Sequence, residues 1–237
     1  MMGNGKRLAI MQPYFLPYIG YFQLIAAVDK FVVYDDVNYI KRGWINRNRI
    51  LLNGIAHTFT VPISRASQNT HICDLALVND GHWRGKLLRT LKQAYANAPY
   101  FEQASDLLAN VIDYQTTSLS AYLLHSLRAL AHHLGLKAEI VDSSSLYHNS
   151  ELTGQSRILD ICKQEQADVY VNPIGGIDLY SRKSFSDQGL ALQFLRPRPT
   201  SYAQGTAVHV PWLSIIDVLM FNERSTVTRM LSEADLM

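Results

Sequence analysis

The fold is decided by residues 8–50, which read LAIMQPYFLPYIGYFQLIAAVDKFVVYDDVNYIKRGWINRNRI. The largely apolar runs at residues 8–12 and 30–35 are both typical of short strands buried in a parallel sheet. Between them, residues 18–28 place apolar side chains at helical spacing. Strand, helix and strand in this order predict a right-handed unit in which the two strands are adjacent and parallel.

The remainder of the chain continues the α/β pattern. Asn53-Gly54 lies between two strand-like runs and predicts a β-hairpin. Helical patterns at residues 80–96, 100–114 and 117–134 predict a helical insertion or subdomain over 80–134. The alternation then resumes, with strands expected at 138–141, 168–171 and 190–195 and helices beginning near Thr153, Ser181, Ser214 and residue 225. We therefore predict a single α/β domain over residues 1–237, built on a mostly parallel, doubly wound sheet.

The composition is that of an ordinary globular protein, because 48% of the 237 residues are hydrophobic and the formal net charge is only +2. So small a charge gives no indication of a nucleic acid partner, and we expect a small-molecule ligand. No run approaches the roughly 18 apolar residues that a membrane-spanning helix needs. Cys73 and Cys162 lack the spacing of a disulfide framework or a metal site, so we expect a reduced, cytoplasmic protein without a bound metal.

Polar and aromatic residues follow the first two predicted strands. In open α/β sheets, ligands bind at the carboxyl ends of the strands. The loop after the strand at 8–12 supplies the candidate ligand-binding residues Gln12, Pro13, Tyr14, Tyr18, Gly20 and Tyr21. The end of the second strand supplies Asp35 and Asp36 as candidate catalytic bases. Because adjacent residues of an extended chain point in opposite directions, at most one aspartate should face the site, and turn formation is the alternative role for both.

The segment Tyr18-Ile19-Gly20-Tyr21 resembles the H-x-G-H element of nucleotidyl transferases in its placement and spacing. In those Rossmann-like proteins, two histidines meet nucleotide phosphates at the start of a helix. Tyrosines stand at the histidine positions here, and a tyrosine hydroxyl can donate a hydrogen bond to phosphate but brings no positive charge. The resemblance therefore predicts a nucleotide-binding loop more strongly than adenylyl transfer. The alternative is a proline-rich turn followed by a helix that packs on the sheet.

Two further loops are candidates for the same site. The loop from Lys41 to Arg49 mixes cations with an indole and amides, and its candidate ligand-binding residues are Lys41, Arg42, Trp44, Asn46 and Arg47. Arginine matches phosphate and carboxylate groups, and a tryptophan can stack on a sugar or a base, so we predict an anionic ligand rather than a merely solvated face. Gly175, Gly176 and Tyr180 lie in the loop after the strand at 168–171 and could close over the site.

Motifs spread over nearly the whole chain carry a family resemblance. They are Gln12-Pro13 with Gly20-Tyr21-Phe22, Asp35-Asp36-Val37, Arg47 to Ile50, Ala98-Pro99-Tyr100-Phe101, Gly175-Gly176 with Tyr180 and Phe185, and Trp212 to Asp217. Together they resemble the WbqC-like protein family, whose members occur among genes for bacterial surface polysaccharides, including O-antigen. The resemblance implies a transferase that attaches an aminoacyl (glycyl-like) or acyl group to a nucleotide-linked sugar. It implies no particular cofactor.

Two alternatives to the transferase stay open at this point. The first is a non-catalytic nucleotide- or sugar-binding module, in which the tyrosines of the H-x-G-H-like element mark a degenerate nucleotide site. The second is a nucleotidyl transferase that uses those tyrosines. The resemblance supplies no catalytic residues, so the roles given to Asp35, Asp36 and the loop cations rest on their chemistry alone.

Overall fold

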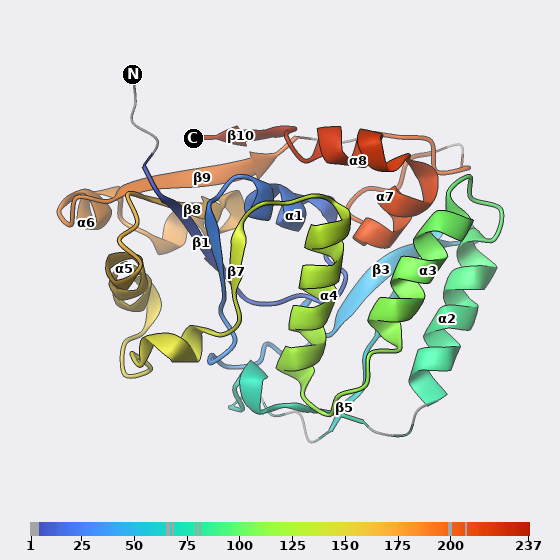
Figure 1. Cartoon of the computed structure of the whole chain (residues 1–237), viewed down its shortest axis with the longest axis horizontal. Coiled ribbons are helices and arrows are strands. Elements are labelled where there is room, and N and C mark those ends of the chain that lie inside the picture. Colours follow the sequence, from blue (N-terminus) through green and yellow to red (C-terminus); the bar gives the residue numbers. More distant parts are fainter. Residues whose placement is uncertain are drawn as a thin grey trace.

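The centre of the molecule is a six-stranded sheet with the order β10-β9-β8-β1-β2-β7 (Figure 1). The computed structural model describes residues 5–64, 67, 69–78, 80, 82–198, 201–206 and 208–237. The strands of this sheet are β1 (Arg7–Met11), β2 (Lys30–Val33), β7 (Glu139–Val141), β8 (Val169–Pro173), β9 (Ala191–Pro197) and β10 (Ala234–Leu236). Five strands run parallel to one another, namely β9, β8, β1, β2 and β7, whereas β10 runs antiparallel to β9. The predicted mainly parallel sheet is confirmed.

The strands β1 and β2 carry the two loops from which the site was predicted. Leu8 pairs with Lys30 and Met11 with Val33 in parallel register, and α1 (Ile19–Ala26) connects the two strands. The predicted adjacency is therefore confirmed. Because the strands are parallel neighbours, the loops that leave their carboxyl ends open on the same edge of the sheet.

Helices pack on both faces of the sheet. One core cluster joins Ala9 and Phe31 to apolar residues of α1, α4 (Leu119–His133) and α7 (Ile215–Phe221). A second cluster joins Leu8 and Val32 to residues of α5 (Gly154–Gln164) and α6 (Arg182–Ser186). Successive residues of a strand point to opposite faces, which is why Leu8 and Ala9 belong to different clusters. Figure 1 shows α5 and α6 at one end of the molecule and α2 (His82–Tyr95) and α3 (Phe101–Ile112) at the other.

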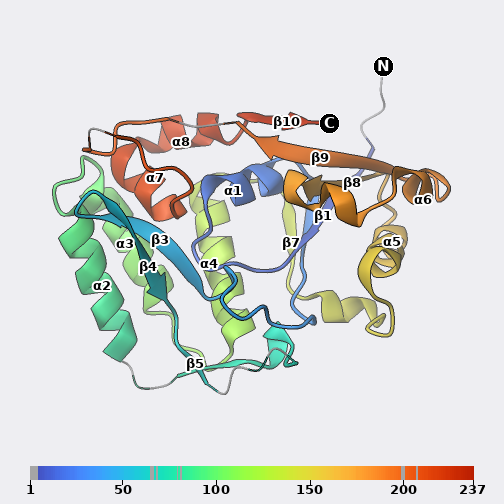
Figure 2. The ribbon, with the colours of Figure 1, turned by 180° about the vertical axis from the view of Figure 1, so that it is seen from behind.

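The predicted hairpin and the three predicted helices are confirmed. Strands β3 (Arg47–Leu52) and β4 (Ile55–Thr60) pair around Asn53 and Gly54, whose φ angles of 52° and 77° fit the turn that this dipeptide favours. Helices α2, α3 and α4 occupy the predicted helical segments, and Figure 2 shows α2 and α3 beside the hairpin. The single-domain organisation, with 80–134 as an insertion, stays a prediction.

The remaining elements are short. They are β5 (Ile63–Ser64), β6 (Ala76–Leu77), α8 (Arg224–Met230) and the 3-10 turns η1 (Ile72–Asp74), η2 (Ser144–Tyr147) and η3 (Ile174–Leu179). The hydroxyl of Ser214 accepts a hydrogen bond from the Ile216 amide at 3.3 Å, which confirms Ser214 as the cap of α7. No helix among the described residues is long and apolar enough to cross a membrane.

The structure corrects the sequence prediction at two places. The chain was expected to end in a short helix from about residue 225, but α8 is followed by β10, which pairs with β9. A three-residue strand has too short a pattern to predict, and its pairing with β9 satisfies an edge of the sheet. The polar loop was expected to extend to Arg49, but β3 already begins at Arg47.

Candidate functional site

A pocket walled by aromatic rings lies beside the loop that follows β1. It has a volume of about 270 Å³. We call it the aromatic pocket, and its lining residues are Tyr14, Pro17, Tyr18, Trp44, Asn48, Arg49 and Trp212. Four segments supply these residues: the loop from β1 to α1, the loop before β3, the strand β3 itself and the segment that leads into α7. The predicted residues Tyr14, Tyr18 and Trp44 are thus brought together in one cavity.

Arg49 is the cation of this pocket. Its guanidinium lies over the Trp44 ring, 5.4 Å from the ring centroid, and one terminal nitrogen donates to the carbonyl oxygen of Trp212 at 3.3 Å. The Nε of Arg49 is buried and finds no hydrogen-bond partner among the described residues. A buried donor that lacks a partner is unusual in a folded protein, which marks Arg49 as a residue whose hydrogen bonds are incomplete within the described part of the chain.

The loop from β1 to α1 is held in place by residues from distant parts of the chain. The side-chain amide of Asn48 donates to the Leu16 carbonyl at 2.9 Å, and the Ser214 hydroxyl donates to the same oxygen at 2.6 Å. The Ile215 amide donates to the Pro17 carbonyl at 2.8 Å. Leu16 has a φ of 45°, a backbone conformation that persists where its surroundings enforce it and that is frequent at functional sites.

Trp212 and Tyr18 form one wall of the aromatic pocket. Their rings meet edge to face with centroids 5.8 Å apart. Trp212 has a φ of 60° and is 57% exposed, which is unusual for so large an apolar side chain. Burial raises the pKa of both Tyr14 and Tyr18 above the ordinary tyrosine value. Both hydroxyls therefore stay protonated at neutral pH and can donate hydrogen bonds.

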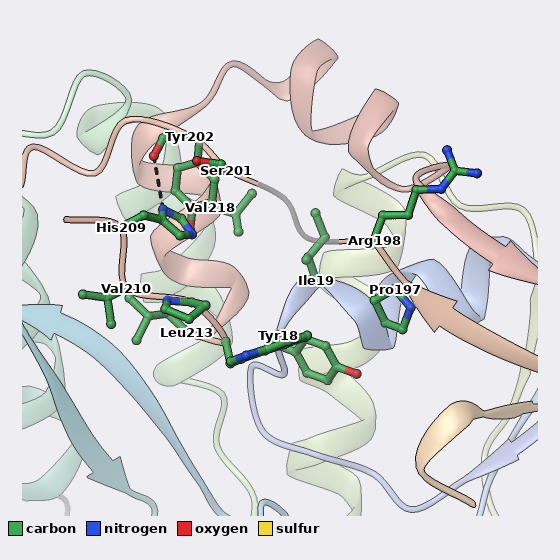
Figure 3. Close-up of a pocket in the computed structure, with 12 residues that line it drawn as sticks. Tyr18, Ile19, Pro197, Arg198, Ser201, Tyr202, His209, Val210, Leu213 and Val218 are labelled. Atoms are coloured by element: carbon green, nitrogen blue, oxygen red, sulfur yellow. Dashed lines mark hydrogen bonds between the residues drawn. The ribbon is translucent and has the colours of Figure 1, made fainter. Parts of the chain in front are cut away.

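A second, smaller pocket lies on the other side of Tyr18 and Trp212 and has a volume of about 130 Å³. We call it the His209 pocket, and Figure 3 shows His209 and Tyr202 on one side of it and Pro197 and Arg198 on the other. His209 Nδ1 lies 3.3 Å from the Tyr202 carbonyl oxygen. Because a carbonyl can only accept, Nδ1 carries the proton of this hydrogen bond, which leaves Nε2 as the acceptor nitrogen in the neutral imidazole. Among the described residues, Nε2 has no hydrogen-bond partner.

Asp217 fixes the segment that forms the wall of the His209 pocket. This carboxylate is fully buried and accepts hydrogen bonds from the Tyr202 hydroxyl at 2.7 Å, the Gln204 amide at 2.8 Å and the Tyr95 hydroxyl at 2.9 Å. Burial raises the pKa of Asp217 against the opposing effect of these donors. Its oxygens are occupied within the protein, so Asp217 is a structural residue of the site.

The predicted catalytic aspartates lie outside both pockets. Asp35 is 2% exposed and accepts hydrogen bonds from Ser120 and, at 2.6 Å, from Ser143. Asp36 is also buried, and its carboxylate accepts from the Ser144 hydroxyl and pairs with the Arg157 guanidinium. The two side chains have separate partners, in agreement with the opposite directions expected of neighbouring residues. Their oxygens are occupied by the protein itself.

The remaining predicted residues of the first loop also contact the protein rather than a pocket. Pro13 is buried, and the Tyr21 hydroxyl donates to the Gln12 carbonyl at 2.8 Å. A Cβ added to Gly20 would collide with the Tyr18 ring and would lie 2.8 Å from Pro197. The absence of a side chain at Gly20 therefore lets the Tyr18 ring pack against α1, whereas the sequence suggested that it lets a ligand approach.

Most of the predicted cations lie at the surface. Lys41 and Arg42 are exposed, and neither lines a pocket described above. Arg47 turns back on its own loop, where its Nε donates to the Gly43 carbonyl at 2.9 Å. Asn46 is buried and bonds Tyr39 at 2.8 Å and the Val61 carbonyl at 2.7 Å, so its role is structural.

The glycine loop after β8 lies apart from the aromatic pocket. A Cβ on Gly176 would collide with the Asn172 side chain, and Gly175 has no atom within 4 Å of that position. The Tyr180 ring packs edge to face against Tyr170 and Phe185, with centroids 5.7 and 5.9 Å away. This loop does not contribute to the lining of either pocket.

Sequence reasoning missed four lining residues: Pro17, Asn48, Arg49 and Trp212. The signal for Arg49 was present, because it belongs to the predicted cationic loop. Trp212 belongs to a motif of the family resemblance, but nothing in the sequence shows that it meets a residue 163 positions away.

The fold and the pocket define an α/β protein with a mainly parallel sheet and a pocket walled by aromatic rings. The WbqC-like protein family matches residues 12–229, and the chain belongs to that family. Over 219 residues it is 30% identical to an uncharacterized protein of Mycobacterium tuberculosis, and the alignment covers 92% of this chain and 94% of that relative. No solved structure matches the chain.

Proposed function

We propose that the aromatic pocket binds a nucleotide-linked sugar and that the protein transfers an aminoacyl or acyl group to it. The observation that carries the proposal is the position of Arg49, which has an unpartnered Nε–H and lies between the Trp44 ring and the Trp212 backbone. The chain belongs to the WbqC-like family, and the proposed link to surface polysaccharides comes from the setting in which members of that family occur.

The chemistry of the lining suits a ring with an attached anion. Rings of tyrosine and tryptophan stack on the face of a base or a sugar. A guanidinium binds phosphate or carboxylate oxygens, and it does so more strongly where water is excluded. The volume of about 270 Å³ is at the lower end for small-molecule sites, so the pocket accommodates one ring and its phosphate while the rest of the ligand extends beyond it.

A transfer to an amino sugar also needs a base. The amine nitrogen attacks the acyl carbonyl carbon, the bond from that carbon to the donor breaks, and the amine proton passes to the base. The sequence proposes Asp35 or Asp36 for this role, but both carboxylates are engaged in internal hydrogen bonds. His209 offers an alternative imidazole, because it lines the neighbouring pocket across the Tyr18–Trp212 wall and only its Nδ1 is hydrogen-bonded among the described residues.

A second candidate function is a non-catalytic binding module. The internal bonding of Asp35 and Asp36 favours it, because it leaves the predicted catalytic carboxylates without an evident free role. Nucleotidyl transfer through the tyrosines has less support, since the Tyr21 hydroxyl is already bonded to Gln12.

Tryptophan fluorescence tests ligand binding directly. The chain has three tryptophans: Trp44 and Trp212 line the pocket, and Trp83 is buried in α2. We expect UDP-, dTDP- or GDP-linked sugars to change the emission of the wild type and to change it less in Trp44→Phe and Trp212→Phe. Trp83→Phe is the matched control and should keep the response. If none of these ligands changes the emission at millimolar concentration, or if only Trp83→Phe abolishes the change, the pocket assignment is wrong.

A further inference from the structure

A cluster of metal-ligand side chains lies in the turn that contains η1, away from both pockets. The donor atoms of His71, Cys73 and Asp74 all lie within 4.8 Å of one another. The Nδ1 of His71 is 4.0 Å from one carboxylate oxygen of Asp74, and the Sγ of Cys73 is 3.8 Å from the other. Imidazole, thiolate and carboxylate are the three ligand types of protein zinc sites.

The backbone of this turn is fixed to the sheet-end loop that follows β2. The Ile72 amide donates to the Val37 carbonyl at 3.0 Å, and the Cys73 amide donates to the Asp35 carbonyl at 2.9 Å. Asn38 and His71 form an isolated antiparallel bridge, and the Ile72 side chain is fully buried. These contacts fix the backbone of the turn, so the side chains of His71, Cys73 and Asp74 project from a rigid segment.

We propose that His71, Cys73 and Asp74 bind one divalent transition-metal ion of the zinc type, with a fourth position open to water. Zinc-to-ligand lengths of about 2.0–2.3 Å imply ligand atoms roughly 3.4–3.6 Å apart in a tetrahedral site. A single ion takes one oxygen of Asp74, and the three donor atoms lie within 4.8 Å of one another, so side-chain rotations must bring them up to about an ångström closer.

Access to the cluster supports an exchangeable ion with an open position. The side chains of His71 and Asp74 are 44% and 67% exposed, so an ion can enter from solvent and keep a water ligand. Three protein ligands and one water are typical of open zinc sites, whereas closed structural sites use four protein ligands. The spacing His-x-Cys-Asp gave no metal signal in the sequence, because the 3-10 turn brings the three donors together. This inference does not depend on the proposed transferase function.

Metal binding is tested with the ion alone, on the reduced 237-residue chain. We expect cobalt(II) to bind with a stoichiometry of one, to give a thiolate charge-transfer band in the near ultraviolet, and to be displaced by zinc. Cys73→Ser should remove the band, and His71→Ala and Asp74→Asn should each weaken binding at least tenfold, since even the loss of outer-shell partners costs about 10–100-fold.

Matched controls separate this site from incidental binding. Cys162→Ala removes the other cysteine, which is buried, and His132→Ala removes an exposed histidine of α4. Both should keep the band and the affinity, and circular dichroism should show that all five variants are folded. The proposal is overturned if the wild type gives no thiolate band with cobalt, or if Cys73→Ser binds the metal as tightly as the wild type.

Discussion

The aspartate cluster and the aromatic pocket both lie after the strands β1 and β2. They differ in whether their polar atoms already have hydrogen-bond partners within the protein. We define the aspartate cluster as Asp35 and Asp36 with their partners Ser120, Ser143, Ser144 and Arg157. Its carboxylates accept hydrogen bonds from the protein and are hidden from solvent. In the aromatic pocket, Arg49 keeps a buried N–H without a partner among the described residues, and Trp212 stays exposed.

This difference separates two roles that look alike in a sequence. Buried polar groups whose hydrogen bonds are complete stabilise and position the chain. Groups with unmet capacity beside a cavity are the better candidates for ligand binding. The aspartate cluster therefore holds η2 and α5 against the end of β2, and the aromatic pocket is where we expect a ligand.

The largest expected effect is on stability, in the aspartate cluster. Arg157→Met should lower the free energy of unfolding by about 3–5 kcal/mol, because it leaves the buried Asp36 carboxylate without its countercharge. Urea denaturation measures the change. The control is Arg128→Met, which removes the exposed pair with Asp142 and should cost less than about 1 kcal/mol. Equal effects of the two substitutions would mean that the aspartate cluster is not a structural centre.

A smaller loss of stability is expected when Gly20, which packs beneath the Tyr18 ring of the aromatic pocket, is substituted. Gly20→Ala should destabilise the protein by about 1–3 kcal/mol, because the new methyl group overlaps the Tyr18 ring and Pro197. It should also weaken ligand binding, since the Tyr18 ring has to move. The comparison is Gly175→Ala, where no atom lies within 4 Å of the added Cβ. If both variants unfold at the same urea concentration, Tyr18 is not held as the structure shows.

The smallest effect concerns a third polar group, Glu165, at the opposite edge of the sheet. Burial opposes its ionisation, but hydrogen bonds from Lys30, Tyr147 and Lys6 outweigh burial and lower the pKa of Glu165 to about 2. A carboxyl group with a lowered pKa in the folded state stabilises the protein above its unfolded pKa, near 4.5, and loses this contribution as the pH falls towards 2.

Glu165→Gln should therefore be less stable than the wild type at pH 7, and the difference should shrink between pH 4.5 and pH 2. Urea titrations at several pH values measure it. Asp187→Asn, in the exposed pair with Lys183, is the control and should show little change at any pH. A Glu165→Gln deficit that is constant with pH would contradict the role given to its charge.

The sequence predicted the elements well because their patterns are local. The apolar runs of β1 and β2, the Asn53-Gly54 turn and the helical spacing of α2 to α4 each depend on neighbouring residues. The lining of the pocket was predicted in part: Tyr14, Tyr18 and Trp44 do line one cavity, whereas the place of Trp212 in it and the pairing of β10 were not predicted. Those two features depend on contacts between residues far apart in the chain, which no local pattern reports.

The aspartates and cations show a second limit of sequence reasoning. Asp35, Asp36 and Arg47 have the residue types of a site, but their hydrogen bonds are made within the protein. Arg49, two positions from Arg47, also lies over the Trp44 ring, but it lines the pocket and its Nε–H remains unpartnered among the described residues. Residue type gives the possible chemistry, and the completed hydrogen bonds decide which residue is free to use it.

We infer that Arg49, rather than Arg47 or Asp35, binds the ligand. The most direct measurement is the dissociation constant of a nucleotide-linked sugar for Arg49→Ala, Arg47→Ala and Asp35→Asn, each checked for folding by circular dichroism. We expect Arg49→Ala to weaken binding by about 10- to 100-fold, the equivalent of roughly 1.5–3 kcal/mol for a charge-assisted hydrogen bond, and the other two to stay within about twofold of the wild type. A loss of affinity in Arg47→Ala or Asp35→Asn, with Arg49→Ala unchanged, would contradict the account.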